Sequence, residues 1–249
     1  EKIRSPKKIR EYQNDAISTW FQNNKKGIFE MATGTGKTYT ALNCLKKIIE
    51  SEKNIFCVIV CPYGHLVKQW RENLDDLISI KNIIADSSNQ KWKDDFVDSI
   101  IDYNERLKNV VILTTYNTFS SSFFINNIGQ INPKTFLICD EMHWSGAKKF
   151  RKGLLNNYNY RLGLSATPSR YFDDSGTDFI LNYFDKCVSK FDLKKAITEI
   201  NPDTNKTYLT PYIYKPILVE LNHDELESYY EISLKISKRI AISQKFDSD

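Results

Sequence analysis

The chain has 249 residues, of which 41% are hydrophobic and 27% charged, as is usual for a globular protein of one large or two small domains. No apolar run approaches the ~20 residues that span a bilayer, and no secretory signal is visible, which argues against a membrane-spanning or secreted protein. The five cysteines form no CxxC pair, so free thiols in a reducing, cytoplasmic compartment are expected rather than a metal site. A net charge of +4 permits nucleic-acid binding without arguing for it.

Short apolar runs alternate with helical patterns along the first two thirds of the chain. The runs are GIFEM, NIFCVIVCP, NVVILTTY, TFLICDE and YRLGLSAT, and their length and composition predict buried parallel strands. Between them, sets such as Ala41, Leu42 and Leu45 share one face of a helix. This alternation predicts an α/β fold of three layers with a mainly parallel sheet.

The first element of interest is IREYQNDAI, residues 9 to 17, which precedes the first strand. The amide of Gln13 can offer one donor and one acceptor to the edge of an adenine. Taken alone, the stretch is equally compatible with a capped surface helix.

A glycine-rich loop, MATGTGKT, joins the first predicted strand to a helix. Gly34 and Gly36 let the backbone wrap closely around phosphate oxygens, and the following helix adds its positive N-terminal dipole. Lys37 can reach the β and γ phosphates, and the hydroxyl of Thr38 can bind Mg²⁺. Met31 stands where the strict phosphate-loop pattern has its first glycine. The predicted ATP-binding residues of the loop are Thr33, Gly34, Thr35, Gly36, Lys37 and Thr38.

Two carboxylates end a later strand, in FLICDEMHW, residues 136 to 144. Asp140 is expected to hold Mg²⁺ and Glu141 to orient and polarise an attacking water, as phosphoryl transfer requires. His143 is either a hydrogen-bonded spacer or a group that senses the γ-phosphate. With Lys37, these three residues make up the predicted catalytic set.

The last predicted strand ends in LGLSATP, residues 162 to 168. Ser165 and Thr167 could form hydrogen bonds to the region of Asp140 and His143, and so couple the nucleotide site to what lies beyond. By itself this short pattern fits an ordinary strand end better.

The pattern weakens after Pro168. Residues 186–195 predict a strand that turns into a helix, and INPDTNKTY predicts a turn. YIYKPILVEL reads as extended, with Pro216 favouring a sheet edge. A helix is predicted for residues 223–240, with no obvious sheet to pack on.

These elements, in this order, resemble the first RecA-like lobe of superfamily 2 helicases and translocases. The residues YQ resemble the Q motif, MATGTGKT motif I, VCPYGHLVKQW motif Ia, LTTYNTF motif Ic, DEMHW motif II in its DExH form, and LGLSATP motif III. The resemblance covers about residues 9 to 168. It implies a groove that contacts nucleic-acid phosphates, lined by Pro62, Tyr63, Leu66, Gln69, Thr114, Thr115 and Tyr116. Trp70 is expected to pack in the core instead.

Within the superfamily, the motifs are most similar to the group that holds the type I and III restriction motor subunits, UvrB and XPB. This similarity implies an ATP- and Mg²⁺-dependent motor on duplex DNA, in restriction and phage defence or in repair. Residues 1–200 would form lobe 1, and residues 201–249 a linker towards a second lobe in a longer parent chain. Nuclease or defence-system subunits are possible partners. An RNA helicase or sensor, and a nucleotide-gated scaffold without efficient hydrolysis, are the alternatives.

Overall fold

The structure, a computed structural model, describes residues 8–52, 54–106, 108–131 and 134–246. Its strands are β1 (Lys26–Met31), β2 (Phe56–Cys61), β3 (Lys81–Ala85), β4 (Val110–Thr115), β5 (Thr135–Cys139), β6 (Tyr160–Ser165), β7 (Cys187–Phe191), β8 (Ile200–Asn201) and β9 (Lys206–Thr207). Its helices are α1 (Glu11–Gln22), α2 (Lys37–Ser51), α3 (Gly64–Leu77), α4 (Trp92–Arg106), α5 (Tyr116–Phe119), α6 (Ser122–Ile128), the 3₁₀ helix η1 (Met142–Gly146), α7 (Lys148–Arg151), α8 (Asp174–Phe184), α9 (Leu193–Thr198) and α10 (His223–Phe246). None of the described helices is both long and apolar enough to cross a membrane.

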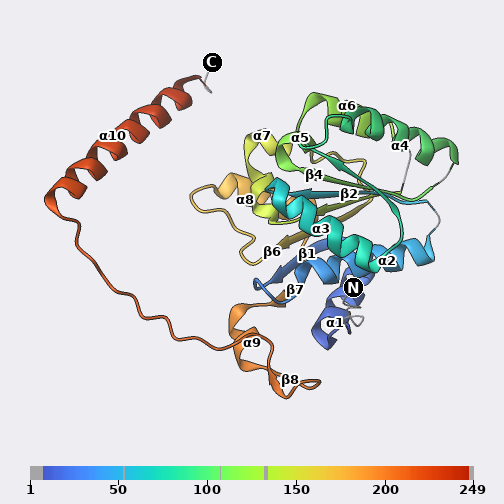
Figure 1. Cartoon of the computed structure of the whole chain (residues 1–249), viewed down its shortest axis with the longest axis horizontal. Coiled ribbons are helices and arrows are strands. Elements are labelled where there is room, and N and C mark those ends of the chain that lie inside the picture. Colours follow the sequence, from blue (N-terminus) through green and yellow to red (C-terminus); the bar gives the residue numbers. More distant parts are fainter. Residues whose placement is uncertain (1–7, 53, 107, 132–133, 247–249) are drawn as a thin grey trace. The chain divides into compact units, whose positions relative to one another are not determined.

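Seven strands form one parallel sheet, in the order β3-β4-β2-β5-β6-β1-β7, with helices on both faces (Figure 1). The three-layer α/β fold expected from the sequence is therefore confirmed. Because all seven strands run the same way, their carboxyl ends meet at one edge of the sheet, where open α/β sheets bind ligands. The strands β5, β6 and β1, which end in the three predicted nucleotide motifs, are neighbours at this edge.

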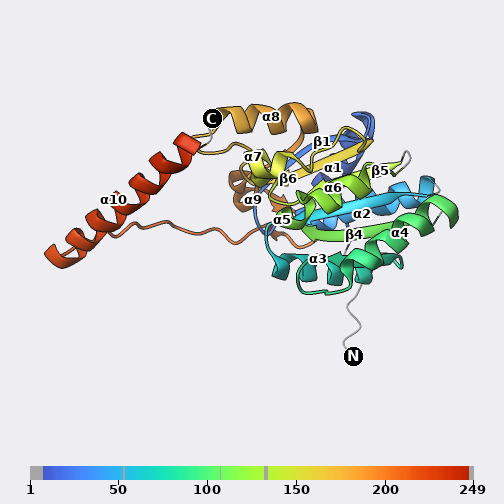
Figure 2. The same cartoon turned by 90° about the horizontal axis from the view of Figure 1, so that it is seen from above.

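Two apolar cores fill the space between the sheet and its helices. On one face, α1, α2 and α3 pack on the sheet through side chains such as Trp20, Leu45 and Trp70. On the other face, α4, α6 and α8 contribute residues such as Phe96 and Phe184. In Figure 2, α3 and α8 lie on opposite sides of the strands. The sheet is thus covered on both faces, as its near-continuous apolar strands require.

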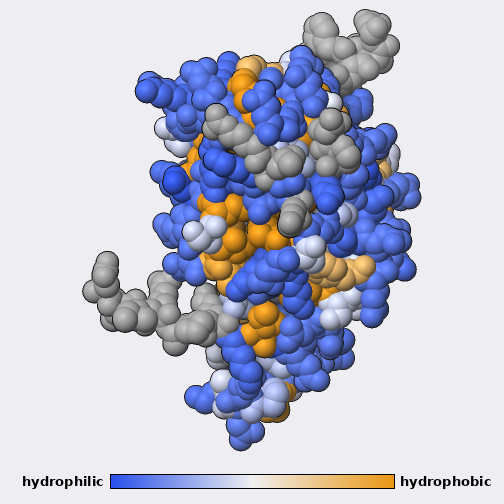
Figure 3. All heavy atoms as spheres, turned by 90° about the vertical axis from the view of Figure 1, so that its right-hand side faces the viewer, coloured by the Kyte–Doolittle hydropathy of each residue, from blue (hydrophilic) through white to orange (hydrophobic). Residues whose placement is uncertain are grey.

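The face of the molecule in Figure 3 lies on the right of Figure 1. Hydrophobic side chains gather near its middle, and hydrophilic side chains border them. Small apolar areas of this kind are normal on a globular protein and indicate no particular function.

The chain divides after Pro211 into two compact units, residues 1–211 and residues 212–249. The hairpin of β8 and β9 packs with the first unit, since the N–H of Leu209 donates to the carbonyl of Ala196 over 2.8 Å. The ring of Tyr208 also meets Tyr12 edge to face. Residues 201–211 therefore pack with the first unit, beyond the boundary expected at residue 200. The assignment of lobe and linker stays a prediction.

The second unit consists of an irregular segment and a helix. Residues 223–240 form the predicted helix, in α10, and residues 186–195 of the first unit form the predicted strand and helix, in β7 and α9. The prediction of an edge strand around Pro216 is wrong, because residues 212–222 form neither helix nor strand. This strongly apolar segment pairs with no strand among the described residues.

Candidate nucleotide site and nucleic-acid groove

The glycine-rich loop follows β1 and turns tightly before α2 begins. Gly34 and Gly36 have φ angles of 83° and 88°, a left-handed conformation that only glycine adopts without strain. A Cβ at Gly36 would lie 2.7 Å from Nε2 of Gln13. The hydroxyl of Thr35 donates to the carbonyl of Ala32 over 2.6 Å, which fixes the turn. The loop is therefore built to bring backbone N–H groups together ahead of α2, where a phosphate would bind.

Lys37 lies in the first turn of α2 and is buried. Its Nζ donates to the carbonyl of Met31 over 3.0 Å, so the ammonium lies under the loop. Burial lowers the pKa of Lys37, while the charges of Glu141 and Asp140 oppose that shift. Lys37 thus lies within electrostatic reach of both carboxylates, and the structure brings the predicted catalytic lysine and acids together. Thr38, the next residue, is half-buried, while Thr33 at the start of the loop is exposed.

Gln13 is buried against the loop. Its Nε2 donates to the carbonyl of Thr35 over 3.3 Å, and its Oε1 accepts from the N–H of Arg10 over 3.0 Å. The hydroxyl of Tyr12 donates to the same carbonyl of Thr35. Gln13 therefore braces the loop, and an adenine that engaged this amide would have to replace these bonds. Its role in reading adenine stays a prediction.

A cavity of about 380 Å³ opens beside this brace. It borders the loop at Gly34 and Gly36, and two cations, Lys8 and Arg10, line it from the N-terminal side. Gln13 also reaches its wall. Its position next to the phosphate loop suits the base and sugar of a nucleotide whose phosphates occupy the loop.

Asp140 and Glu141 follow β5 at the same edge of the sheet. Asp140 is buried, and its Oδ2 accepts a hydrogen bond of 2.8 Å from the indole N–H of Trp70. Its Oδ1 accepts from the N–H of Glu141 over 3.1 Å. Burial raises the pKa of Asp140, and the bond from Trp70 opposes that rise. Glu141 has a φ of 45° and a ψ of 55°, which is strained for a residue with a side chain.

The site fits a magnesium ion held jointly with phosphates. The described residues contain no group of three or more His, Cys, Asp or Glu side chains that could hold a metal by itself. Mg²⁺ prefers one or two protein oxygen ligands, with phosphates and water completing the octahedron. The carboxylate of Asp140 and the hydroxyl of Thr38 supply oxygen donors of that kind.

His143 connects motif II to the end of β6. Its Nδ1 lies 3.3 Å from Oγ of Ser165, so the predicted contact between these two motifs is present. The same Oγ accepts from the backbone N–H of Thr167 over 3.1 Å, whereas the Thr167 side chain is exposed. Burial, and then the charge of Arg170, lower the pKa of His143. Its ring is thus neutral near pH 7, and the contact of 3.6 Å to Glu141 is not an ion pair.

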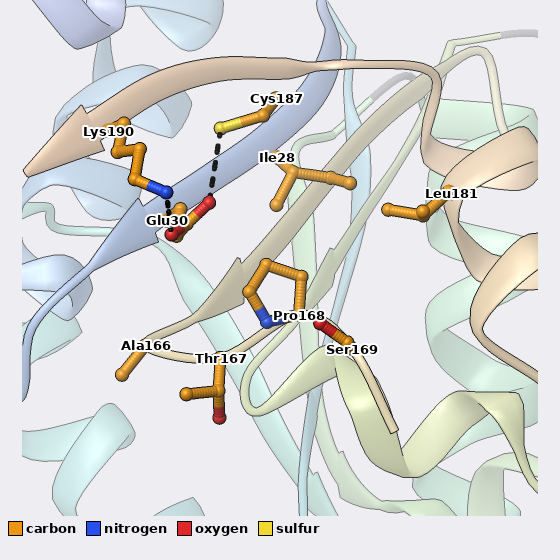
Figure 4. A pocket seen from close by; sticks show the side chains of 9 residues that line it. All are labelled: Ile28, Glu30, Ala166, Thr167, Pro168, Ser169, Leu181, Cys187 and Lys190. Carbon is orange, nitrogen blue, oxygen red and sulfur yellow. Dashed lines mark hydrogen bonds and ion pairs between the residues drawn. The ribbon is translucent and has the colours of Figure 1, made fainter. Parts of the chain in front are cut away.

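A second cavity, of about 350 Å³, lies beyond Thr167 and Pro168 (Figure 4). Its wall includes an ion pair of 2.6 Å between Lys190 on β7 and Glu30 on β1. The thiol of Cys187 points towards the same carboxylate in Figure 4, at 3.9 Å. No sequence pattern indicates this cavity, since it depends on the pairing of β7 with β1.

The residues predicted for the nucleic-acid groove fall into two groups. Tyr63, just before α3, and Gln69 on α3 are exposed. Leu66 on α3 and Thr115 at the end of β4 are half-buried. The side chains of the other three are inside the fold: Pro62, Thr114 and Tyr116. For these three, a phosphate contact could come only from the backbone. The groove itself stays a prediction.

Two buried partners of Asp140 were not assigned to the nucleotide site from the sequence. The expected core packing of Trp70 is confirmed, but the same side chain also bonds the Asp140 carboxylate. Tyr116 was expected in the groove, yet its hydroxyl donates to the carbonyl of Asp140 over 2.9 Å. The sequence signal for such a contact is the single polar atom on each large ring. A buried indole N–H or phenol hydroxyl needs a hydrogen-bond partner.

The phosphate loop, the paired carboxylates and the parallel sheet together define a class of protein. The chain is a RecA-like, ATP-binding lobe of a superfamily 2 helicase or translocase, a class of enzymes that hydrolyse ATP. More narrowly, it belongs to the family described as type III restriction enzyme, res subunit, which it matches over residues 6–170.

Two relatives show how much of a whole protein this chain spans. It is 27% identical over 236 residues to the DNA 3'-5' translocase XPB2 of Sulfurisphaera tokodaii, which is 94% of this chain and 45% of that protein. It is 26% identical over 176 residues to a putative DNA 3'-5' helicase Rad25 of Haloarcula marismortui, which is 70% of this chain and 25% of that protein. The chain therefore spans less than half the length of the relatives it matches.

Solved structures share the fold at low identity. The type ISP restriction-modification enzyme LlaGI, solved as a nuclease-deletion mutant with a DNA substrate mimic, has a TM-score of 0.62 and 21% identity, over 77% of this chain and 20% of that one. The SWI2/SNF2 ATPase core of Sulfolobus solfataricus, in complex with dsDNA, has a TM-score of 0.55 and 17% identity, over 74% of this chain and 38% of that one. At such identities the likeness shows the fold alone.

Proposed function

We propose that the protein containing this chain is an ATP-driven motor that moves along duplex DNA. The observation that carries the proposal is the meeting of Lys37, Asp140 and Glu141 at one sheet edge, in a chain of the restriction res-subunit family. The relatives named as DNA translocase and DNA helicases support DNA over RNA.

In this motor, each residue of the nucleotide site has a separate task. Lys37 and the N–H groups of the loop hold the β and γ phosphates. Thr38 and Asp140 hold Mg²⁺, which when bound neutralises charge that develops on the phosphates. Glu141, whose backbone has a left-handed conformation, orients the attacking water and takes up its proton. His143 and Ser165 link this site to the end of β6.

A second RecA-like lobe completes the site in this proposal. The relatives are more than twice as long as the part that this chain matches, which leaves room for such a lobe. An arginine supplied across the cleft is worth about 10³ to 10⁵ in rate in comparable enzymes. The 249-residue chain by itself is therefore expected to bind ATP weakly and to hydrolyse it at well below ~1 s⁻¹.

The grip on DNA is assigned to the accessible part of the predicted groove. The exposed Tyr63 and Gln69, near the start of α3, and the half-buried Thr115, the last residue of β4, can contact phosphates without reading sequence. ATP closes the lobes and hydrolysis reopens them, so that the grip is released and renewed one step further along.

Restriction and defence against foreign DNA is the setting that the family favours, with nuclease or other defence subunits as partners and DNA repair as the rival. A cytoplasmic location is part of the proposal, supported by five cysteines that are all free.

The test is the ATPase rate of the full-length protein with no nucleic acid, duplex DNA, single-stranded DNA and duplex RNA. Strong stimulation by duplex DNA alone is expected. Glu141→Gln should abolish that turnover and keep ATP binding, because the amide cannot take up the proton. Stimulation by RNA alone would move the protein to the RNA helicases. An unchanged rate in Glu141→Gln would overturn the catalytic assignment and favour a scaffold.

A further inference from the structure

Two buried donors converge on Asp140 from different parts of the fold. The indole Nε1 of Trp70 donates to the Asp140 carboxylate over 2.8 Å, and the hydroxyl of Tyr116 donates to the Asp140 carbonyl over 2.9 Å. Asp140 follows β5, which lies next to β2, and β2 lies next to β4. Trp70 lies in the connection that follows β2, and Tyr116 lies in the connection that follows β4. The two donors therefore follow the next two strands along the sheet.

Both bonds are inside the protein, where they are strong and specific. Trp70 is 2% exposed and Tyr116 is 1% exposed, so water does not compete for either donor. Hydrogen bonds of this kind are electrostatically stronger than in water, and losing one partner leaves a buried polar group unsatisfied. A shift of either donor therefore moves or destabilises the group it holds.

The same two connections carry accessible side chains of the predicted groove. Trp70 directly follows Gln69, which is exposed on α3, and Tyr116 directly follows Thr115, which is half-buried at the end of β4. In each pair, one side chain is at least partly accessible and its neighbour reaches inward to Asp140. A force applied to the accessible residue therefore acts on the backbone that positions the inner donor.

We propose that Trp70 and Tyr116 are positioning residues that couple the DNA groove to the magnesium carboxylate of Asp140. DNA bound along α3 and the end of β4 fixes the positions of the two donors. The donors in turn fix the positions of the carboxylate and the carbonyl of Asp140. The inference rests on the proposed function and adds the route by which DNA and nucleotide influence each other.

Thermodynamic linkage gives the coupling a measurable form. If DNA changes the affinity for the nucleotide by some factor, the nucleotide changes the affinity for DNA by the same factor. Such factors are typically about 5 to 150. Loss of either hydrogen bond should therefore lower the coupling factor strongly. It should change the affinity for DNA without nucleotide very little.

The test uses Trp70→Phe and Tyr116→Phe in the full-length protein, since each removes one donor and leaves an aromatic ring at the position. Tyr183→Phe is the matched control, because it removes a buried donor to the carbonyl of Leu155, away from Asp140. DNA affinity is measured by anisotropy of a labelled duplex, with and without a non-hydrolysable ATP analogue and Mg²⁺. Analogue affinity is measured with and without the duplex, and with and without Mg²⁺.

In the Trp70 and Tyr116 variants, the coupling factor should fall towards one while DNA affinity without nucleotide stays at the wild-type value. Trp70→Phe should also weaken the dependence of analogue binding on Mg²⁺, with no DNA present. Tyr183→Phe should keep the wild-type factor. Wild-type coupling in both test variants would overturn this inference and leave the motor proposal standing. A wild-type protein that binds no duplex would overturn both.

Discussion

At the scale of single residues, the site depends on backbone angles that most side chains avoid. Gly36 adopts a φ of 88° without strain, whereas Glu141 is held at a φ of 45° by its surroundings. A strained, non-glycine residue at the end of a strand is a frequent mark of function. The surrounding fold thus maintains the geometry of this site. Small local changes should therefore alter the affinity for the nucleotide.

Gly36→Ala should weaken ATP binding. The methyl group would lie 2.7 Å from Nε2 of Gln13, and a left-handed alanine costs about 1–2 kcal/mol. The free loop of the variant should relax away from this conformation, and restoring it on binding lowers the affinity by roughly 5- to 30-fold. Titration with a fluorescent ATP analogue measures the change. Gly129→Ala is the control, because Gly129 has a φ of −59° and lies after α6. Equal affinities in the two variants would contradict the prediction.

His143→Gln should flatten the dependence of stability on pH. The folded protein lowers the pKa of His143, so the unfolded chain takes up this proton first as the pH falls below about 6.5. Wild-type stability should therefore decline through this window, and the neutral glutamine should remove that part of the decline. Urea unfolding at a series of pH values from about 5 to 7.5 measures it. Parallel curves for the two proteins would show that His143 titrates normally.

At the scale of elements, α1 joins the sheet and the nucleotide loop. One side of the helix places Gln13 against the loop, and its far end buries Trp20, whose Nε1 donates to the carbonyl of Arg161 over 3.0 Å. Trp20 also packs on Phe136 of β5. The position of Gln13 therefore depends on packing one helix length away.

Trp20→Ala should destabilise the protein by about 3–5 kcal/mol, the usual loss for a large aromatic side chain in a core. Trp20→Phe keeps most of the packing and should cost about 0.5–1.5 kcal/mol for the hydrogen bond. Chemical denaturation of both variants gives these free energies. Ser18→Ala, on the exposed side of α1, should stay within about 0.5 kcal/mol of the wild type. Similar losses for Trp20→Ala and Ser18→Ala would rule out the anchoring role.

At the scale of the whole molecule, the chain consists of two units with different surfaces. Residues 1–211 contain the parallel sheet and both apolar cores. The second unit exposes large apolar side chains along the chain, among them Ile213, Leu218, Tyr229 and Leu234. Exposed apolar surface of this extent binds hydrophobic probes.

A fragment of residues 1–211 should fold by itself and bind the ATP analogue as the 249-residue chain does. It should also bind less of the dye ANS, because the exposed apolar side chains of residues 212–239 are gone. Thermal unfolding, analogue titration and ANS fluorescence check the three points. Loss of cooperative unfolding in the fragment would show that the first unit depends on the second.

The sequence by itself determined the fold class and the chemical groups of the nucleotide site. The five central strands could be predicted because each is a short, apolar run with its own signal, while β3, at the sheet edge and half-buried, has a weaker one. The loop around Gly34 and Gly36 and the pair Asp140 and Glu141 are also local patterns.

Only the tertiary structure decided what these groups contact. The bond from Trp70 to Asp140 joins residues 70 positions apart, and the bond from Tyr116 joins residues 24 apart. Both exist because β5, β2 and β4 are neighbours in the sheet, and this order is set by long-range packing. For the same reason the sequence could place Gln13 near the nucleotide but could not show that its amide holds the loop. Local patterns specify which groups are present, whereas the order of the strands specifies which of them meet.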